Sequence, residues 1–166
     1  MDQFYRIAGL TVKMNTFGHT AQLAQPYRLE DGSDVDIAVV SDYRLLKQRH
    51  PGISDNNCEY IASGRSFYQS LIDYDGFMLH ASAIAVDGRA YLFSADSGTG
   101  KSTHTDPWRQ ILGEDRVCVI NDDKPALRRQ NGVWYAYGTP WSGKHGRNQN
   151  TAFPVGGICF LERGET

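Results

Sequence analysis

The sequence predicts a mixed α/β fold in which a hairpin-rich sheet carries few helices. The apolar runs at 77–86 and 89–94 are separated only by Asp87-Gly88, a dipeptide typical of two-residue hairpin turns. Asn131-Gly132 stands between two later strand-like segments in the same way. Hairpin strands run antiparallel, whereas parallel strands need longer crossover connections. The sheet is therefore expected to be mixed rather than wholly parallel.

Residues 1–75 are expected to form an accessory α/β subdomain without a chemical signature. Alternating apolar and polar residues predict its strands, and apolar pairs at i and i+4 predict its second helix. Capping side chains and a Pro-Gly pair limit its first helix. The expected elements are strands at 7–14 and 35–40, a short helix that Ser41 and Asp42 cap and that ends at Arg49 before Pro51-Gly52, and a helix around 67–72.

Residues 76–166 are expected to form the core, in which a proline sets the helix limits. The run 77–86 is nearly all apolar, as in a strand that is buried on both faces. Pro107 lacks a backbone donor and clashes with the preceding turn, so a helix that starts shortly before it should be short. Asp106 and Pro107 would then begin a second short helix that ends at Gly113. The remaining expected elements are strands at 117–120, 126–129, 133–137 and 157–161, with a long polar loop at 138–154.

Residues 91–103 carry the pattern of a phosphate-binding loop: an apolar strand, a loop of small residues and the start of a helix. Gly98 and Gly100 lack a Cβ, so backbone N–H groups can curl around phosphate oxygens, and the helix N-terminus adds its own free N–H groups. Lys101 adds a charge for the terminal phosphates, and Ser102 offers a hydroxyl to Mg²⁺. The predicted nucleotide-binding residues are Asp96, Ser97, Gly98, Thr99, Gly100, Lys101, Ser102 and Thr103.

An acidic pair, Asp122 and Asp123, directly follows the strand predicted at 117–120. One carboxylate can hold Mg²⁺ at the terminal phosphates, and the other can orient or deprotonate an acceptor hydroxyl. We assign the metal to Asp122 together with Ser102. A solvated turn is the alternative, and the upstream glycine-rich loop favours the functional interpretation. The other acidic pair, Glu114-Asp115, follows a helix end and is interpreted as a surface turn.

A histidine and a basic loop have two interpretations each. His80 lies in the apolar run beside the strand that feeds the glycine-rich loop. It can stand next to the terminal phosphate or the second acid, or it can be a hydrogen-bonded core histidine. The polar segment 138–150 carries Lys144, His145 and Arg147, which can close over a transferring phosphate or recognise the acceptor. An exposed loop without such a role is the alternative.

The composition argues against several classes of function. A net charge of −2 and a pI near 6.2 argue against a nucleic-acid-binding surface. No apolar run is long enough to span a membrane, and the first residues lack the apolar core of a signal peptide, which predicts a cytoplasmic location. Cys58, Cys118 and Cys159 lack Cys-x-x-Cys spacing and are interpreted as buried, reduced thiols rather than a disulfide or a zinc site.

Several segments of the second half match the motifs of one family. They are Leu79–Ala83, Ser97–Thr103, Thr103–Thr105, Val119–Asp123, Asn121–Pro125, Gly138–Lys144 and Phe160–Gly164. In this order they resemble the kinase domain of HPr kinase/phosphorylase, and still more the small HPr-kinase-related proteins of bacteria. Both groups are similar in fold to ATP-dependent phosphoenolpyruvate carboxykinase. The resemblance extends from about residue 75 to residue 164.

The resemblance implies a phosphoenolpyruvate carboxykinase-like core that carries the phosphate-binding loop. It also implies an ATP- and Mg²⁺-dependent kinase that phosphorylates a serine hydroxyl on a protein or peptide. Lys101 and Ser102 would hold phosphate and metal, Asp122 and Asp123 would serve metal and acceptor, and His80 would assist nearby. Because relatives occur beside peptide-modification genes, a ribosomally made peptide is one expected acceptor. Residues 1–75 would complete the sheet or dock the acceptor, and a homo-oligomeric state is left open.

Three departures from the family pattern keep an alternative function open. The first loop glycine is Ala95, Asp106-Pro107 shortens the helix after the loop, and the chain ends at Thr166 where kinase domains of this kind continue. The core is therefore expected to be shorter at its C-terminus than in that family: the form is truncated or naturally minimal, or another chain supplies the missing part. The alternative is a non-catalytic ATP-binding module that regulates or binds a partner. Phosphoenolpyruvate carboxykinase itself needs a much longer chain.

Overall fold

The computed structural model describes residues 3–32, 34–96, 100–113, 115–143 and 146–162, without the side chain of Ser102. The first part contains β1 (Phe4–Ile7), β2 (Leu10–Lys13), α1 (Gly18–Ala24), β3 (Arg28–Leu29), β4 (Ile37–Ala38), α2 (Tyr43–Arg49) and α3 (Asp55–Leu71). The second contains β5 (Gly76–Met78), β6 (Ala81–Val86), β7 (Arg89–Ser94), α4 (Lys101–Leu112), β8 (Val117–Asn121), β9 (Ala126–Gln130), β10 (Val133–Tyr137) and β11 (Ala152–Phe160). Short 3-10 turns occupy Gln25–Tyr27 and Ile72–Tyr74.

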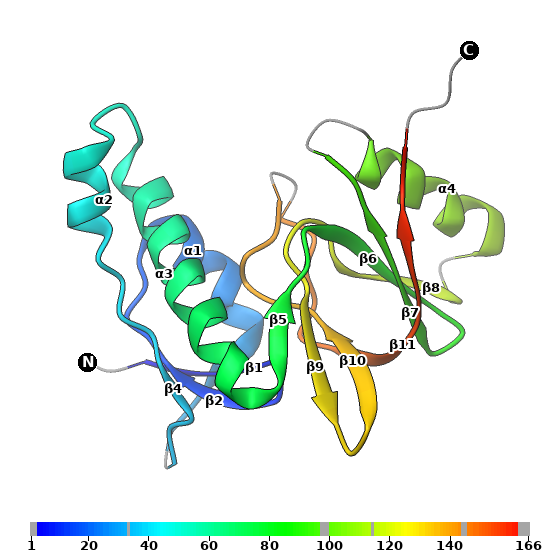
Figure 1. Ribbon diagram of the computed structural model, residues 1–166, viewed down its shortest axis with the longest axis horizontal. Coiled ribbons are helices and arrows are strands. Elements are labelled where there is room, and N and C mark those ends of the chain that lie inside the picture. The colour runs from blue at the N-terminus through cyan, green and yellow to red at the C-terminus, as the bar shows by residue number, and fades with distance from the viewer. Residues whose placement is uncertain (1–2, 33, 97–99, 114, 144–145, 163–166) are drawn as a thin grey trace.

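The described strands form two sheets rather than one. A four-stranded sheet has the order β3-β1-β2-β4, and a seven-stranded sheet has the order β5-β9-β10-β11-β7-β6-β8. The four-stranded sheet and α1–α3 lie at one end of the molecule, and α4 lies at the other end (Figure 1). In the larger sheet β7 and β11 pair in parallel while the other pairs are antiparallel, which confirms the mixed α/β class.

Both predicted hairpin turns are present, and their backbone angles explain the sequence. Asp87 and Gly88 have φ values of 48° and 78° between β6 and β7, and Asn131 and Gly132 have 49° and 83° between β9 and β10. Positive φ at both central residues is the condition for the turn that best matches the twist of hairpin strands. Gly, Asn and Asp tolerate these angles at the lowest cost.

Local patterns were insufficient for the first strand and for the helices near it. Residues 7–14 were predicted as one strand, but Ala8 and Gly9 have φ values of 52° and 74° and form the turn of a β1–β2 hairpin. The strand expected at 35–40 is reduced to β4, and α1 was not predicted. The short helix ends as predicted at Arg49, and α3 begins earlier than expected because Ser54 Oγ accepts from the Asn57 N–H at 3.3 Å.

The apolar run 77–86 is two strands with different partners. β5 pairs with β9, whereas β6 pairs with β7 and β8, so the prediction of one continuous strand was wrong. The change of partner falls on Leu79 and His80. The backbone N–H of Leu79 donates to Pro125 O at 3.3 Å, and that of Ala81 donates to Asp123 O at 3.1 Å. His80 therefore lies beside the segment that contains the acidic pair.

The prediction of two short helices around Pro107 was also wrong, because α4 is continuous from Lys101 to its predicted end at Gly113. Pro107 lies on the exposed side of α4, where water can satisfy the carbonyl that loses its donor. On the opposite side Trp108 and Leu112 pack against the sheet. Tertiary packing thus overrides the local cost of the proline.

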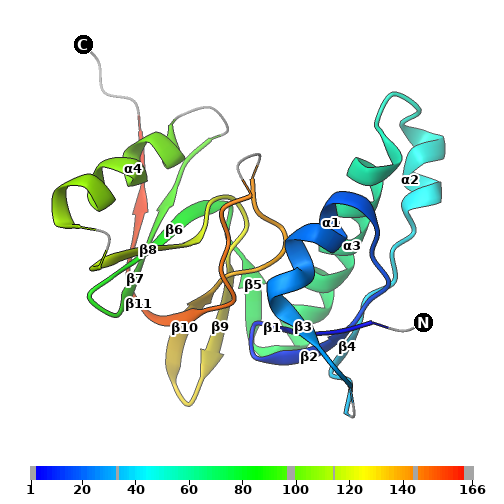
Figure 2. The ribbon, with the colours of Figure 1, turned by 180° about the vertical axis from the view of Figure 1, so that it is seen from behind.

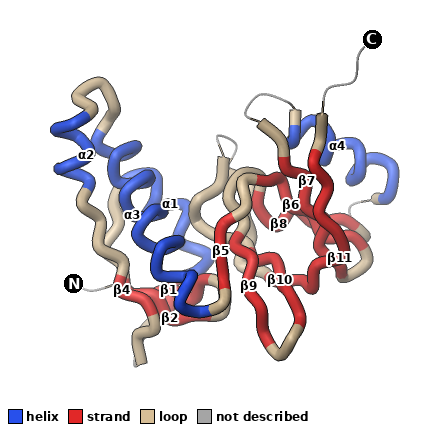
Figure 3. The backbone as a smooth tube through the Cα atoms, in the orientation of Figure 1, coloured by secondary structure: helices blue, strands red, loops and turns tan. Residues whose placement is uncertain are grey.

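In its described residues, the loop between β10 and β11 has no helix or strand (Figure 3), and it is held by packing. The Trp141 ring is fully buried and stacks on Phe67 of α3 with centroids 4.9 Å apart, and its Nε1–H donates to Ser63 Oγ at 3.1 Å. Seen from both sides, this loop runs between the α1–α3 end and the β6–β8 strands (Figures 1 and 2). No helix in the described residues is long and apolar enough to cross a membrane.

The three cysteines differ in burial. Cys58 is buried and Cys118 is partly buried, but Cys159 on β11 is exposed, so the prediction of a buried thiol was wrong there.

Candidate functional site

Sheet topology brings the predicted site residues to one edge of the larger sheet. β6 is antiparallel to both of its neighbours, so Ala81 at its start pairs with Ser94 at the end of β7, and Ala83 pairs with Asn121 at the end of β8. The glycine-rich loop, His80 and the acidic pair therefore leave the sheet at the same edge. This convergence depends on the antiparallel order that the Asp87-Gly88 turn establishes.

At this edge Lys101 is folded back onto the loop that precedes it. Gly100, the residue before α4, has a φ of 99°, which confirms the expected positive angle there. Lys101 is 9% exposed, and its Nζ donates to Ala95 O at 3.0 Å and to Asp96 O at 3.4 Å. The ammonium group thus stands at the start of the helix, where free backbone N–H groups also favour an anion.

Several predicted phosphate-site residues lie outside the described residues. These are Ser97, Gly98 and Thr99, together with the side chain of Ser102. Of the others, Asp96 and Thr103 are exposed. Ala95, which stands at the first glycine position of the phosphate-binding loop pattern, is not among the residues with positive φ, so alanine fits that position.

Asn121 at the end of β8 holds the acidic turn in place. Its fully buried side chain accepts through Oδ1 from the backbone N–H groups of Asp123 and Lys124, at 2.9 and 2.8 Å. Its Nδ2 donates to the backbone O of Thr139 at 3.0 Å. This local turn is typical of asparagine and fixes the directions of the two aspartates. Sequence reasoning did not assign this role, although Asn directly before two acids is a signal for it.

Asp122 is buried, at 6% exposed, and it is tied to the loop between β10 and β11. Its Oδ1 accepts from the Gly143 N–H at 2.7 Å, and its own N–H donates to Arg147 O at 3.2 Å. Gly138 is required at the start of this loop, because a Cβ there would lie 1.8 Å from Gln149 O.

The fixed Asp122 carboxylate matches the oxygen ligands that Mg²⁺ prefers, which in proteins are one or two carboxylates plus phosphate and water. Among the described residues no group of three or more His, Cys, Asp or Glu side chains forms an all-protein metal site.

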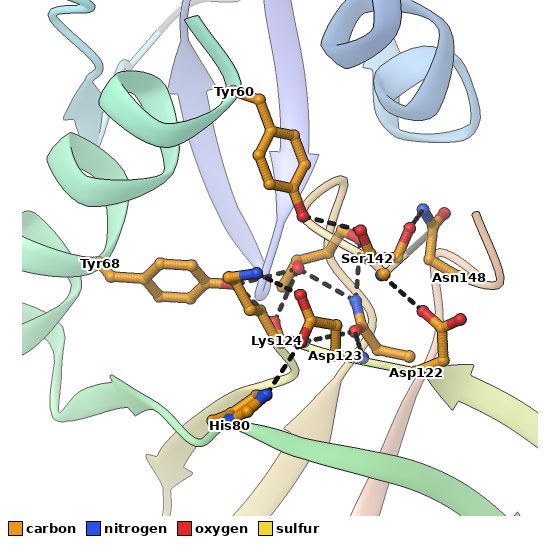
Figure 4. Close-up of polar contacts among 11 residues, drawn as sticks. Tyr60, Tyr68, His80, Asp122, Asp123, Lys124, Ser142 and Asn148 are labelled. Carbon is orange, nitrogen blue, oxygen red and sulfur yellow. Dashed lines mark hydrogen bonds and ion pairs between the residues drawn. The ribbon is translucent and has the colours of Figure 1, made fainter. Parts of the chain in front are cut away.

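Asp123 and His80 face each other at the surface of the same turn (Figure 4). His80 Nε2 lies 3.2 Å from Asp123 Oδ1, and Lys124 Nζ contacts Oδ2 of the same carboxylate. The His80 side chain is 45% exposed and that of Asp123 is 21% exposed, so the interpretation of His80 as a core histidine was wrong. A partly buried carboxylate that pairs with a half-exposed imidazole has the geometry of a proton-accepting pair.

Two tyrosines of α3 reach the segments around the acidic turn (Figure 4). Tyr68 Oη donates to Lys124 O at 2.5 Å and lies 3.0 Å from Thr139 Oγ1, and Tyr60 Oη donates to Ser142 O at 2.7 Å. Burial raises the pKa of both phenols, and the charge of Asp123 raises it further, so both remain hydrogen-bond donors. Sequence reasoning found no chemical signature in this helix, since its contribution depends on contacts about 60 to 80 residues away in the chain.

The basic loop is anchored to α4 through one of its predicted cations. Arg147 Nη1 donates to Asp106 Oδ1 at 2.6 Å, and the Arg147 side chain is 40% exposed. Lys144 and His145 lie outside the described residues. Arg147 therefore connects the loop over Asp122 with the helix that follows the glycine-rich loop.

No protein-family model matches the sequence, and no curated protein matches it. One solved structure with a partial match is the Hpr(Ser) kinase/phosphatase from Coxiella burnetii. The match has a TM-score of 0.40 and 15% sequence identity, and it covers 52% of this chain and 59% of that chain. This chain thus accounts for about three fifths of the length of that structure. The roles of individual residues rest on the geometry described above.

Proposed function

We propose that this chain is an ATP- and Mg²⁺-dependent kinase that phosphorylates a serine hydroxyl on a protein or peptide. The observation that carries the proposal is the His80–Asp123 pair, with 3.2 Å between Nε2 and Oδ1, at the same sheet edge as Lys101 and Asp122. Phosphoryl transfer needs mainly positioning and charge stabilisation, and these residues provide both. A ribosomally made peptide is one acceptor that fits the proposal.

The nucleotide would be held by the loop that ends at Gly100 and by the start of α4. Lys101 would exchange its two carbonyl partners for oxygens of the terminal phosphates, which accept charge-assisted hydrogen bonds. Asp122, with Ser102, would hold Mg²⁺. A metal held there would supply positive charge that offsets the negative charge developing on the transferring phosphate.

Asp123 would receive the hydroxyl proton of the acceptor serine while the serine oxygen forms a bond to the terminal phosphorus of ATP. The bond between that phosphorus and the bridging oxygen breaks, and ADP leaves with the electron pair. His80 and Lys124 hold the two carboxylate oxygens of Asp123, so the base keeps one orientation while it accepts the proton. The proton can then leave through the half-exposed His80 ring to solvent.

The test is to incubate the chain with Mg-ATP and a library of serine-containing peptides, and to detect phosphoserine by mass spectrometry. We expect Asp123→Asn to lower transfer by about 10²–10⁴-fold. ATP affinity, measured by calorimetry, should stay within about twofold, because Asp123 is assigned to the acceptor rather than to the nucleotide. Asp115→Asn changes an exposed acid of the rival pair and serves as the matched control.

Two results would contradict the proposal in different ways. Wild-type protein that binds ATP but phosphorylates none of the peptides or proteins of a lysate would favour the non-catalytic ATP-binding module. Wild-type protein that does not bind Mg-ATP would remove the nucleotide site itself.

A further inference from the structure

The α1–α3 end of the molecule contains a cavity that the proposed kinase site does not use. It has a volume of about 410 Å³, which is within the range of small-molecule pockets. Three parts of the chain surround it: the end of β2, α3, and the segment that follows β4. Its lining consists of Lys13, Met14, Asn15, Phe17, Ala38, Val39, Val40, Ser41, Tyr43 and Glu59.

Glu59 is a fully buried acid in this lining, with 0% of its surface exposed. Neither of its carboxylate oxygens has a hydrogen-bond partner of acceptable distance and angle among the described residues. Glutamate is almost never fully buried unless it is paired. A buried carboxylate without partners is costly, so this position calls for a group that the chain itself does not supply.

Three hydroxyls without partners occur in the same region. Ser41 lines the cavity, Thr16 lies between two lining residues, and Thr20 on α1 is close enough to Glu59 to affect its titration. Together with the two carboxylate oxygens of Glu59, their oxygens are the buried side-chain atoms that lack a hydrogen-bond partner in the described part of the chain. Such groups are rare in folded proteins, and a cluster of them indicates a missing water, ion or ligand.

The lining favours an organic cation over other occupants. A carboxylate can only accept when ionised, so its partner must be a donor, and a positive charge also offsets its desolvation. Phe17 and Tyr43 form an edge-to-face pair in the lining with centroids 5.1 Å apart, and Phe17 is 37% exposed. Aromatic faces attract ammonium and guanidinium groups.

We propose that this cavity binds an organic cation, an ammonium or guanidinium group, whose N–H groups bond the Glu59 carboxylate while its stem packs against Phe17 and Tyr43. The cation belongs to a small amine or to a basic side chain of a peptide. Two cations of the chain border the site, Lys13 in the lining and Arg44 with its Cζ 5.8 Å from the Tyr43 ring centroid. Their positive charges repel a bound cation, so its affinity depends on the contact with the Glu59 carboxylate.

Binding of the cation competes with protonation of Glu59. Burial raises the pKa of this carboxyl group, while the hydroxyls of Thr20 and Ser63 act in the opposite direction. Because the cation binds the ionised form, affinity rises as the pH rises through the raised pKa, and proton uptake weakens binding below it. The other titratable groups in the lining are Lys13 and Tyr43.

The experiment titrates the full chain with Nα-acetyl-arginine amide by NMR and calorimetry. Nα-acetyl-citrulline amide is the neutral isostere, n-butylammonium is the free amine, and an arginine flanked by glycines is the peptide arm. We expect the arginine amide to bind at least about tenfold more tightly than the citrulline amide, and Glu59→Gln to abolish that difference. Tighter binding of the peptide than of butylammonium would assign the site to a basic side chain, and the reverse order would assign it to a free amine.

Two further variants keep the test decisive if Glu59→Gln folds poorly. Tyr43→Leu should weaken arginine binding by about threefold to tenfold, because it removes one aromatic face. Asp73→Asn changes an exposed acid outside the cavity and should leave binding unchanged. The proposal is overturned if citrulline and arginine bind equally, if no probe binds, or if only sodium or potassium ions compete for the site. None of these measurements involves nucleotide, so failure here is independent of the kinase proposal.

Discussion

Two adjacent residues of α3 belong to regions with opposite hydrogen-bonding states. Tyr60 contributes to the acidic turn, where Asn121, Thr139 and Tyr68 satisfy one another and the backbone around Asp123. Glu59, one position earlier, faces a cavity in which its own carboxylate has no partner. A satisfied network is rigid and suits positioning for chemistry. An unsatisfied buried group instead marks a place where binding can supply the missing interaction.

Replacement of Lys101 should have the largest effect on phosphoryl transfer. It tests whether this lysine, whose ammonium group bonds two backbone carbonyls, belongs with the residues that position the reaction. Lys101→Ala removes the ammonium group that contacts Ala95 O and Asp96 O. We expect phosphoryl transfer to fall by about 10²–10³-fold, because one preorganised charge at the transferring group is lost. The measurement is the single-turnover rate with Mg-ATP and an accepted peptide. Arg109→Ala, at a cation later in the same helix, is the control, and a near-wild-type rate for Lys101→Ala would remove the lysine from the site.

The acidic turn itself is tested by Asn121→Ala. The change leaves the N–H groups of Asp123 and Lys124 and the backbone O of Thr139 without their partner. We expect a loss of about 2–3 kcal/mol in the free energy of unfolding, since buried polar groups left unpaired carry their full desolvation cost. Urea unfolding followed by circular dichroism measures this, with the exposed Asn57→Ala as the control. Equal stability of the two variants would show that the turn does not depend on Asn121.

The sequence predicted the features of the site that depend on neighbouring residues. Asp87-Gly88 and Asn131-Gly132 specify their turns locally, and positive φ at Gly100 follows from the lack of a side chain. The division of the apolar run into β5 and β6 at His80 was not predictable. The run has the same apolar pattern whether it forms one strand or two strands with different partners. Periodicity distinguishes buried from exposed positions, not one partner strand from another.

Contacts that are distant in sequence explain the other errors. Pro107 was predicted to start a second helix. What keeps α4 continuous is the packing of Trp108 and Leu112 on the sheet, and this contact cannot be inferred from the local sequence. Tyr60 and Tyr68 have the helical spacing of ordinary packing residues, and their role appears only where Lys124 and Ser142 meet them. The contacts of these two tyrosines around the acidic turn could therefore not be predicted from local sequence patterns.

A smaller effect is expected for Tyr68→Phe, which removes one donor from the satisfied region. Lys124 O keeps its bond from Thr139 Oγ1 at 2.9 Å, so no backbone group is left unpaired. We expect a loss of about 1 kcal/mol in the free energy of unfolding, the usual net value of one hydrogen bond. The control is Tyr135→Phe, whose hydroxyl makes no hydrogen bond within the described residues. A loss as large as that of Asn121→Ala would mean that Tyr68, rather than Asn121, determines the turn.

Glu59→Gln should have the smallest effect on the free energy of unfolding. Unlike Asn121→Ala and Tyr68→Phe, it should stabilise the protein. Because burial raises the pKa of the folded carboxyl above its unfolded value, the folded protein binds more protons in the interval between them. Wild-type stability is therefore fully present below the unfolded pKa and is lost as the pH rises through the raised folded pKa. Glutamine cannot ionise, so the variant should lack this loss and be more stable by on the order of 1 kcal/mol above the interval.

Urea unfolding of both proteins at about pH 5 and about pH 8 measures the difference, with the exposed Asp73→Asn as the control. The cation should reverse the order of stability, because it binds the folded wild-type protein and not the variant. If Glu59→Gln is instead strongly destabilised at both pH values, Glu59 has partners in solution that resemble those of the acidic turn. The two regions would then be alike, and the cavity would no longer indicate a binding site.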